Sequence, residues 1–598
     1  MLTISKAALL AATLGFSAIP VIGALPALAQ DAVEAEAGDT GADEDDVPFA
    51  VAISVPSIIA VDSSMDEAAL RDVFTTNFLD RTEELANLDA TSITIPELSL
   101  SLSVTEGEET YDSSVVYRDL VLTNIVDGRV ESMTIGSMET VAPDERTVYG
   151  GTTQDGFDIR RTLELVGLVE GDASAPMSPL YNSFTIGSGT HESQFFSCSF
   201  GELTGTATEA RPVGTPFSAV MSAVSELVDA GDEPPAAAIG TVIEYAVDVF
   251  TAFRGGAMSM GPLDCAAADE SMPISLSLAG TSSGPFEPGI YPEMHIDGLA
   301  VDAGELGNGS LDSFVLKPID LNPTLGALRA SATDLDEQWF EANWRSLIPA
   351  ISGFSLGGLD LDVINPEAEG ERVQATIGSL DLDLSAYVNG VPSRVAFSGD
   401  GIDVPLPQDS TDPQVTMLLA AGLDKVNMGF NVAAGWDEAT ESIALTEAAI
   451  GALDLGRLSV SADIGNATAA LFDSDTDVAA IAAQNVTVRS VTLHFTDEGF
   501  GDIAWPLAAA QEGQTDVEAF RTQMAGFAEG LALQLFGSTE QARGLGAALG
   551  DFVSGRAASV TLTLTAKDPA GLPLPAFIAA QEDPTVLAGL LDVSGSAQ

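Results

Sequence analysis

Positive charge is scarce in this 598-residue sequence. Lysine and arginine together number 22, against 89 aspartate and glutamate residues, and the formal net charge is −67. Such a surface repels nucleic-acid phosphates and anionic lipid headgroups, so we expect no nucleic-acid partner. The acids are dispersed rather than clustered, which favours solubility in a salty medium over a dedicated cation-binding surface.

Cysteine is also scarce: Cys198 and Cys265 are the only two in the sequence. No C-x-x-C spacing occurs, which argues against a redox pair. In an oxidising compartment the two cysteines predict one disulfide. It would close a loop of about 67 residues and contribute roughly 4 kcal/mol in the chain-entropy model. Two free, buried thiols are the alternative.

Long apolar runs are missing except at the N-terminus. Residues 7–24 are uncharged, Lys6 precedes them, and Ala27 and Ala29 provide the small residues that a signal peptidase requires. We therefore predict a signal peptide at 1–29, with an uncleaved membrane anchor as the alternative. After cleavage we expect no transmembrane span and a periplasmic protein, or alternatively a secreted or outer-envelope-associated one.

The rest of the chain is predicted to fall into four parts. Residues 30–46 are acidic and lack large apolar side chains, which is typical of a disordered tether. An N-terminal α+β domain with both cysteines is expected at 47–270. A β-hairpin repeat region follows at 271–488, and a strand–helical hairpin–strand region at 489–598.

Helical periodicity is confined to a few segments, whereas most other residues alternate between apolar and polar with period two. The expected fold class is therefore mainly β (α+β). We expect an extended antiparallel sheet of repeated β-hairpins with a few amphipathic helices and helical hairpins packed on it. The helical segments are one after the capping box Ser64-x-x-Glu67, a pair at 217–230 and 236–254, and a pair over 515–554 whose second helix is capped by Ser538-x-x-Gln541.

A degenerate repeat with the core Ile-Gly-Ser lies inside the alternating segments. Glycine in the middle of a strand usually marks a β-bulge or a close approach of two backbones. The copies are irregularly spaced, which argues against a strict solenoid or propeller. They are Ile135-Gly136-Ser137, Ile186-Gly187-Ser188, Ile377-Gly378-Ser379 and the looser Ile450-Gly451-Ala452.

Two segments match the G-x-S-x-G pattern of serine hydrolases. Gly353-Phe-Ser355-Leu-Gly357 matches the nucleophile elbow G-x-S-x-G, which requires a helix after the serine. A strand pattern follows instead, and His494 lies in another strand pattern. A second match at 280–284 is followed at once by Pro285 and indicates a turn. We predict no enzyme and no catalytic residue, with a serine hydrolase using Ser355 as a remote alternative.

No metal or cofactor site is predicted. The three histidines lie far apart in the sequence, without a second histidine at ligand spacing. Asp473-x-Asp475-x-Asp477 opens like a calcium loop, but Val478 and Gln484 occupy the positions that need glycine and glutamate. Alternate strand acids indicate a solvated face, with a weak divalent-ion ladder as the alternative. The histidines are His191, His295 and His494, and the strand acids are Asp360, Asp362, Asp381 and Asp383.

The hairpin repeats, with strings such as Ile377-Gly-Ser-Leu-Asp-Leu-Asp-Leu384, resemble those of AsmA-like proteins and of other poorly characterised proteobacterial periplasmic envelope proteins. The resemblance extends over about 290–465 and implies a role in outer-membrane biogenesis or lipid movement between membranes. That group typically keeps an N-terminal anchor, and its lipid-bridging members are longer than this chain. The resemblance supplies no active-site residue.

The leading hypothesis is a non-catalytic exported envelope protein with a β-repeat scaffold. It would bind a lipid or other hydrophobic or amphipathic molecule, or aid outer-membrane maintenance with envelope protein partners. An ordinary filled core would explain the same amphipathic strands without a ligand. The alternative function is a structural or adhesive acidic protein that binds divalent cations.

Overall fold

The computed structural model describes residues 49–106, 109–230, 235–269, 273–332, 339–340, 343–365, 372–408, 410, 413–420, 422–576 and 589–598. The expected signal peptide at 1–29 and tether at 30–46 lie outside these residues. The expected fold class is confirmed, because the chain is mainly β, with a large antiparallel sheet and several helices packed on it. No helix in the described ranges combines the length and apolarity needed to cross a membrane.

The chain divides into two units. Unit 1 comprises residues 1–305 and 324–336, and unit 2 comprises 306–323 and 337–598. In unit 1, β1 and β2 pair with β3, β3 forms a long hairpin with β4, and two antiparallel ladders continue from β4 to β19.

The strands of unit 1 are β1 (Phe49–Ser54), β2 (Ile59–Val61), β3 (Ala90–Glu106), β4 (Glu109–Val126), β5 (Arg129–Ile135), β6 (Ser137–Ala142), β7 (Glu145–Tyr149), β8 (Thr152–Asp158), β9 (Ser178–Ile186), β10 (Gly189–Ser193), β11 (Phe196–Phe200), β12 (Leu203–Ala210), β13 (Phe253–Arg254), β14 (Met258–Met260), β15 (Leu263–Ala267), β16 (Ser275–Leu278), β17 (Gly280–Ser283), β18 (Ile290–Tyr291) and β19 (Met294–Asp302). One ladder runs β4–β5–β8–β9–β12–β14–β17 and the other β4–β6–β7–β10–β11–β15–β16. Each ladder ends on β19.

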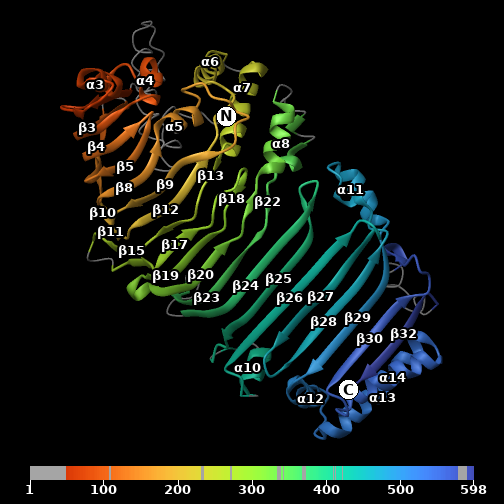
Figure 1. Cartoon of the computed structure of the whole chain (residues 1–598). Helices are drawn as coiled ribbons and strands as arrows, with labels where there is room; N and C mark the ends of the chain where they lie inside the picture. Colours follow the sequence, from red (N-terminus) through yellow and green to blue (C-terminus); the bar gives the residue numbers. More distant parts are fainter. Residues whose placement is uncertain are drawn as a thin grey trace. The chain divides into compact units, whose positions relative to one another are not determined.

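Unit 2 is an antiparallel meander in which each main strand pairs with the next one along the chain (Figure 1). Its main strands are β20 (Gly307–Leu316), β23 (Gly353–Ile364), β24 (Arg372–Val388), β25 (Val391–Pro405), β26 (Lys425–Asp437), β27 (Ser442–Ala452), β28 (Gly456–Gly465), β29 (Thr487–Asp497), β30 (Ser559–Ala566) and β32 (Leu591–Ala597). Short strands are β21 (Ile319–Asp320) and β22 (Ala350–Ile351), which pair with each other, and β31 (Leu572–Pro573), which pairs with β29.

The helices are α3 (Glu67–Thr75), α4 (Thr82–Ala86), α5 (Ile159–Leu165), α6 (Phe217–Asp229), α7 (Ala236–Thr251), α8 (Asn322–Ser331), α10 (Pro413–Ala420), α11 (Thr476–Gln484), α12 (Phe500–Gln511), α13 (Val517–Phe536) and α14 (Glu540–Val553). The predicted helical pairs are confirmed as α6 with α7 and α13 with α14. Both predicted capping residues are wrong by one or two positions. Asp66, not Ser64, accepts from the backbone of Ala69, and Thr539, not Ser538, accepts from Ala542.

Glycines of unit 1 lie where the chain passes from a strand of one ladder to a strand of the other. Gly136 separates β5 from β6, and Gly187 lies between β9 and β10. The Gly187 amide donates to the Gly151 carbonyl over 2.9 Å, so hydrogen bonding continues across the break. A Cβ at residue 187 would lie 3.0 Å from that carbonyl oxygen. The prediction that the repeat glycines mark bulges or close backbone approaches is confirmed here.

The sheet of unit 1 contains a buried side-chain amide, that of Gln154, without a hydrogen-bond partner among the described residues. Gln154 of β8 is 1% exposed, and neither its Oε1 nor its Nε2 has a partner within the described residues. Its register partners are Met133 and Phe184, so the amide lies among apolar side chains. A buried polar group left unpaired costs about 1–3 kcal/mol.

We therefore expect Gln154→Met to raise the free energy of unfolding by about 1–3 kcal/mol, because methionine has a similar shape and no polar atom to desolvate. Urea unfolding would measure the change. Gln523→Met on the exposed side of α13 is the matched control and should change stability by less than about 0.5 kcal/mol. A lower stability of Gln154→Met would contradict the prediction.

Candidate binding face

The strands of unit 2 align apolar residues in unbroken rows across the sheet. Residues that face each other in an antiparallel ladder project to the same side, so a row of register partners forms one strip of surface. One row consists of Phe354, Leu382, Phe397, Val432, Ala448, Val460 and Leu493. The next consists of Leu356, Leu380, Gly399, Phe430, Ile450, Leu458 and Phe495. We call the side that carries these rows the apolar face.

The opposite side of the same strands is largely polar. Because side chains alternate along a strand, the residues next to the first apolar row project the other way. Their row consists of Ser355, Asp381, Ser398, Asn431, Ala449, Ser459 and His494. We call this side the polar face.

On β24 and β25 the alternation of apolar and polar residues shifts by one position partway along the strand. The Ile377-Gly378-Ser379 copy of the repeat lies at this shift, and apolar side chains stay on the same face on both sides of it. On β26, Met428 and Phe430 are two residues apart and share a face. Their partners on β25 are Ile402 and Gly399, which are three residues apart because β25 has a bulge between them. On β24 the corresponding residues flank Gly378, which lies beside Gly401, where φ is 63°. The copy Ile377-Gly378-Ser379 therefore marks the point where the apolar–polar alternation of β24 shifts by one residue.

Among the described residues, helices pack closely on the apolar face at the C-terminal end of unit 2. There α14 packs on β30 and β32, with Leu545 buried against Leu562 and Val593. Gly595 permits this close packing, since a Cβ on it would lie 2.9 Å from the Cα of Leu545. Leu562 and Gly595 extend the first apolar row, so α14 lies on the apolar face.

Further along the sheet, the apolar face meets little protein. Among the described residues, no helix packs extensively on β23 to β28, and α10 and α11 lie at strand ends (Figure 1). Three side chains of the two rows are strongly exposed: Val432 at 37%, Leu458 at 41% and Ile450 at 56%. A small buried cluster around Trp436 and Phe472 covers only one end of β26 and β27. As far as the described ranges extend, the rest of the apolar face is an open strip, which we call the open apolar strip.

Several acids on the polar face form ion pairs with lysine or arginine. Lys317 Nζ donates to Asp381 over 3.0 Å and to Asp383 over 2.6 Å. Partial burial alone would lower the pKa of Lys317, but these two hydrogen bonds raise it above its usual value. The same lysine holds the pKa of Asp383 below its usual value. The acids that were expected to lie on a solvated face therefore lie on the polar face, and Asp381 and Asp383 form ion pairs there.

Further ion pairs follow the same pattern on neighbouring strands. Arg372 Nε lies 2.6 Å from Asp362 and lowers its pKa. Hydrogen bonds from Lys425 and Asn427 lower the pKa of Asp403, and those from Arg457 and Asn431 lower the pKa of Glu447. Within the described residues, no group of three or more potential metal ligands comes together.

The candidate serine and histidine lie in the same polar row but are far apart. Ser355 is in β23, flanked in register by Val315 and Asp381, and no helix follows it. His494 is in β29 and its Nδ1 lies 2.8 Å from the hydroxyl of Thr561. Five strands separate β23 from β29, which is about 29 Å at the usual strand spacing. The structure does not bring Ser355 and His494 together.

The other candidate ligands have local hydrogen-bonding roles. Asp475 caps α11 by accepting from the amides of Asp477 and Val478, and Asp473 accepts from the amide of Asp475. His191 Nδ1 lies 2.9 Å from Thr147 Oγ1, and His295 Nε2 lies 2.7 Å from Glu293 Oε1.

The two cysteines face each other on β11 and β15, with their sulfur atoms 2.14 Å apart, at disulfide distance as expected. A shallow depression of about 350 Å³ lies over this part of unit 1. Its polar side chains come from four strands, and they are Thr190, Ser197, Ser199, Asp264, Ser275 and Ser277.

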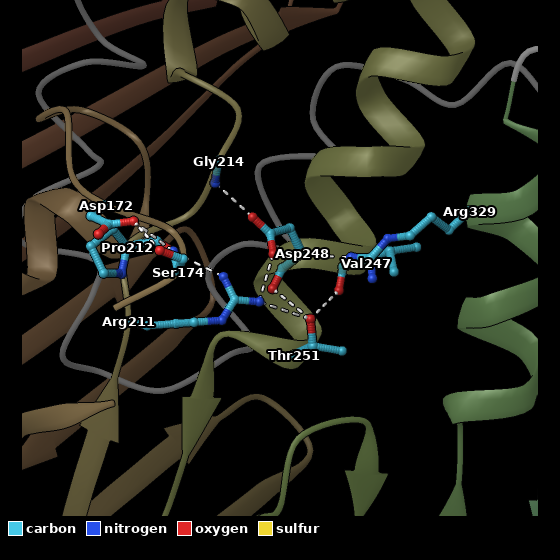
Figure 2. Close-up of polar contacts among 9 residues, drawn as sticks. All are labelled: Asp172, Ser174, Arg211, Pro212, Gly214, Val247, Asp248, Thr251 and Arg329. Atoms are coloured by element: carbon cyan, nitrogen blue, oxygen red, sulfur yellow. Dashed lines mark hydrogen bonds and ion pairs between the residues drawn. The ribbon is translucent and has the colours of Figure 1, made fainter. Parts of the chain in front are cut away.

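An ion pair that no sequence motif predicted joins a loop of unit 1 to α7 (Figure 2). Arg211 Nη2 donates to Asp248 Oδ1 over 2.6 Å and to Thr251 Oγ1 over 3.2 Å. The other carboxylate oxygen of Asp248 accepts from the Gly214 amide over 2.7 Å. Both charged side chains are largely buried, at 18% and 14% exposure, and Arg329 of α8 lies 4.0 Å from Asp248. These contacts tie helix to loop.

Comparisons with known proteins identify no characterised relative. A protein-family model described only as "Uncharacterized protein" matches residues 449–598, which is less than half of the chain. No curated protein and no solved structure matches. The AsmA-like resemblance therefore stays a prediction.

Proposed function

We propose that the protein is a non-catalytic, exported envelope protein that binds an acyl amphiphile on the apolar face of unit 2. The supporting observation is the open apolar strip over β23 to β28, with Val432, Ile450 and Leu458 exposed. Soluble proteins rarely leave a contiguous apolar surface of this kind without a binding role. Export rests on the predicted leader, and the cysteine pair at disulfide distance fits an oxidising compartment.

The dimensions of the strip suit an acyl chain. The rows run across the strands, and seven strands from β23 to β29 span about 29 Å. One leaflet of a bilayer, which an acyl chain fills, is about 15 Å thick. Each buried methylene contributes about 0.8 kcal/mol, so a chain laid across several strands would bind favourably without a deep pocket.

Two substitutions at neighbouring register positions test the proposal. We expect Ile450→Gln with Leu458→Gln to weaken acyl-ligand binding about 30-fold, because it removes about 2 kcal/mol of apolar contact. Uptake of a fluorescent acyl probe would measure affinity, and mass spectrometry of the native protein would identify any co-purifying lipid. The fold should persist, since both side chains are already largely exposed.

The matched control is Ser459→Gln, which follows Leu458 on β28 and projects to the polar face. It should leave probe affinity within about twofold of the unaltered protein. If the unaltered protein neither carries nor takes up any acyl ligand, the proposed function is wrong. Equal losses in the double variant and the control would place binding elsewhere.

A further inference from the structure

The basic side chains of β24 to β28 project away from the apolar face. Each basic residue between positions 353 and 465 immediately precedes an apolar-face residue on its strand, and therefore projects to the polar face. The residues and their successors are Arg372 with Val373, Arg394 with Val395, Lys425 with Val426, and Arg457 with Leu458. Three of the four are already engaged by Asp362, Asp403 and Glu447. A headgroup phosphate on the apolar face would meet no cation from these strands.

The most exposed part of the apolar face ends near the turn between β27 and β28, where two acids occur in the chain. Ile450 and Leu458 are register partners, Leu458 is opposite Phe495, and the ring of Phe495 contacts Phe500, which is 52% exposed. These side chains form a patch that ends at the turn between β27 and β28. Leu453 in that turn is 65% exposed.

Two acids lie at this end of the strands. Asp454 is in the β27–β28 turn, and the Glu498 amide donates to the Leu455 carbonyl over 3.0 Å. In the part of the chain that the structure describes, neither carboxylate forms an ion pair, unlike Asp381 or Asp403 on the polar face. An acyl chain resting on Ile450 and Leu458 would place its headgroup beside these two charges.

We propose that the occupant of the apolar face is an acyl amphiphile with an ammonium group in its headgroup and no net negative charge. This inference rests on the proposed function and specifies its ligand. Charge complementarity supports it, because local carboxylates and a net charge of −67 both attract cations and repel anions. Salt screens charges more than about 10 Å apart at 0.1 M, so Asp454 and Glu498 should dominate over the distant acids.

Three probes with the same acyl chain test the headgroup preference on the full-length protein. They are a choline ester, an uncharged monoacylglycerol and an anionic lysophosphatidylglycerol, each used below its micellar concentration. At low salt we expect the choline ester to bind about tenfold or more tighter than the anionic probe, with the uncharged probe between them. At about 1 M salt, where screening acts within about 3 Å, the differences should largely vanish.

The double variant Asp454→Asn with Glu498→Gln locates the effect. It should weaken binding of the choline ester about threefold to tenfold and leave the uncharged probe unchanged. Asp360→Asn on the polar face is the control and should change the affinity for neither the choline ester nor the uncharged probe. Equal or tighter binding of the anionic probe by the unaltered protein would overturn the headgroup inference alone. Failure of all three probes to bind would overturn the proposed function itself.

Discussion

Replacing Cys198 and Cys265 together by alanine is expected to lower the free energy of unfolding of unit 1 by about 4 kcal/mol. The disulfide closes a loop of 67 residues, and opening it restores the corresponding entropy to the unfolded chain. Within that loop lie β12, α6 and α7, and one buried cluster joins Ala210 of β12 to Ala252, which directly follows α7. Urea unfolding with and without reductant, followed by a probe in unit 1, would measure the loss.

The reduced, unaltered protein is the control for the cysteine variant. Reductant should destabilise the unaltered protein by the same amount and leave the alanine variant unchanged. Titration of thiols in denatured protein before and after reduction checks the pairing directly. A variant as stable as the oxidised protein would show that β11 and β15 hold together without the covalent bond.

Removing the charge of Asp248 is expected to cost about 3 kcal/mol. Asp248→Asn keeps the volume of the side chain but leaves the largely buried Arg211 without its partner, and an unpaired buried charge is strongly destabilising. It also weakens the acceptor for the Gly214 amide. Chemical unfolding and protease sensitivity of the loop around Pro212 would both report the loss.

Arg329→Met supplies the matched control for Asp248. Arg329 is half-exposed and 4.0 Å from the same carboxylate, so its removal should cost less than about 1 kcal/mol. In a double-mutant cycle, Arg211→Met with Asp248→Asn should be less damaging than the sum of the single changes. Additive losses would contradict the assignment of these two residues as a coupled pair.

Sequence periodicity predicted many of the strands and helices, but not which strands pair with one another. Alternation predicted the strands, and three- and four-residue spacing predicted α6, α7, α13 and α14. It missed α12, where Pro506 interrupts the pattern, and it misplaced the caps because Asp66 and Thr539 compete with neighbouring polar residues for the same role. Local patterns do not contain the information on which strand lies beside which.

The candidate site depended on that missing information. The sequence indicated amphipathic strands, but a filled core and an open face have the same alternation. The register rows joining Phe354 to Leu493 become visible only when the strands are paired. The same limit applies to Arg211 and Asp248, which are 37 residues apart and carry no motif. A five-residue motif, in contrast, pointed to Ser355 where the structure has a continuous strand.

Because the apolar rows run across the strands, the length of the open apolar strip depends on how many hairpins the chain contains. Adding one hairpin, which is two strands, to the meander would lengthen the strip by about 10 Å, and removing one would shorten it by the same amount. Neither change would alter the side chains that the other strands contribute to the apolar face, provided that the new strands contain the same one-residue shift of alternation that occurs at Gly378. Duplication of a short gene segment could thus set the reach of such a protein in discrete steps.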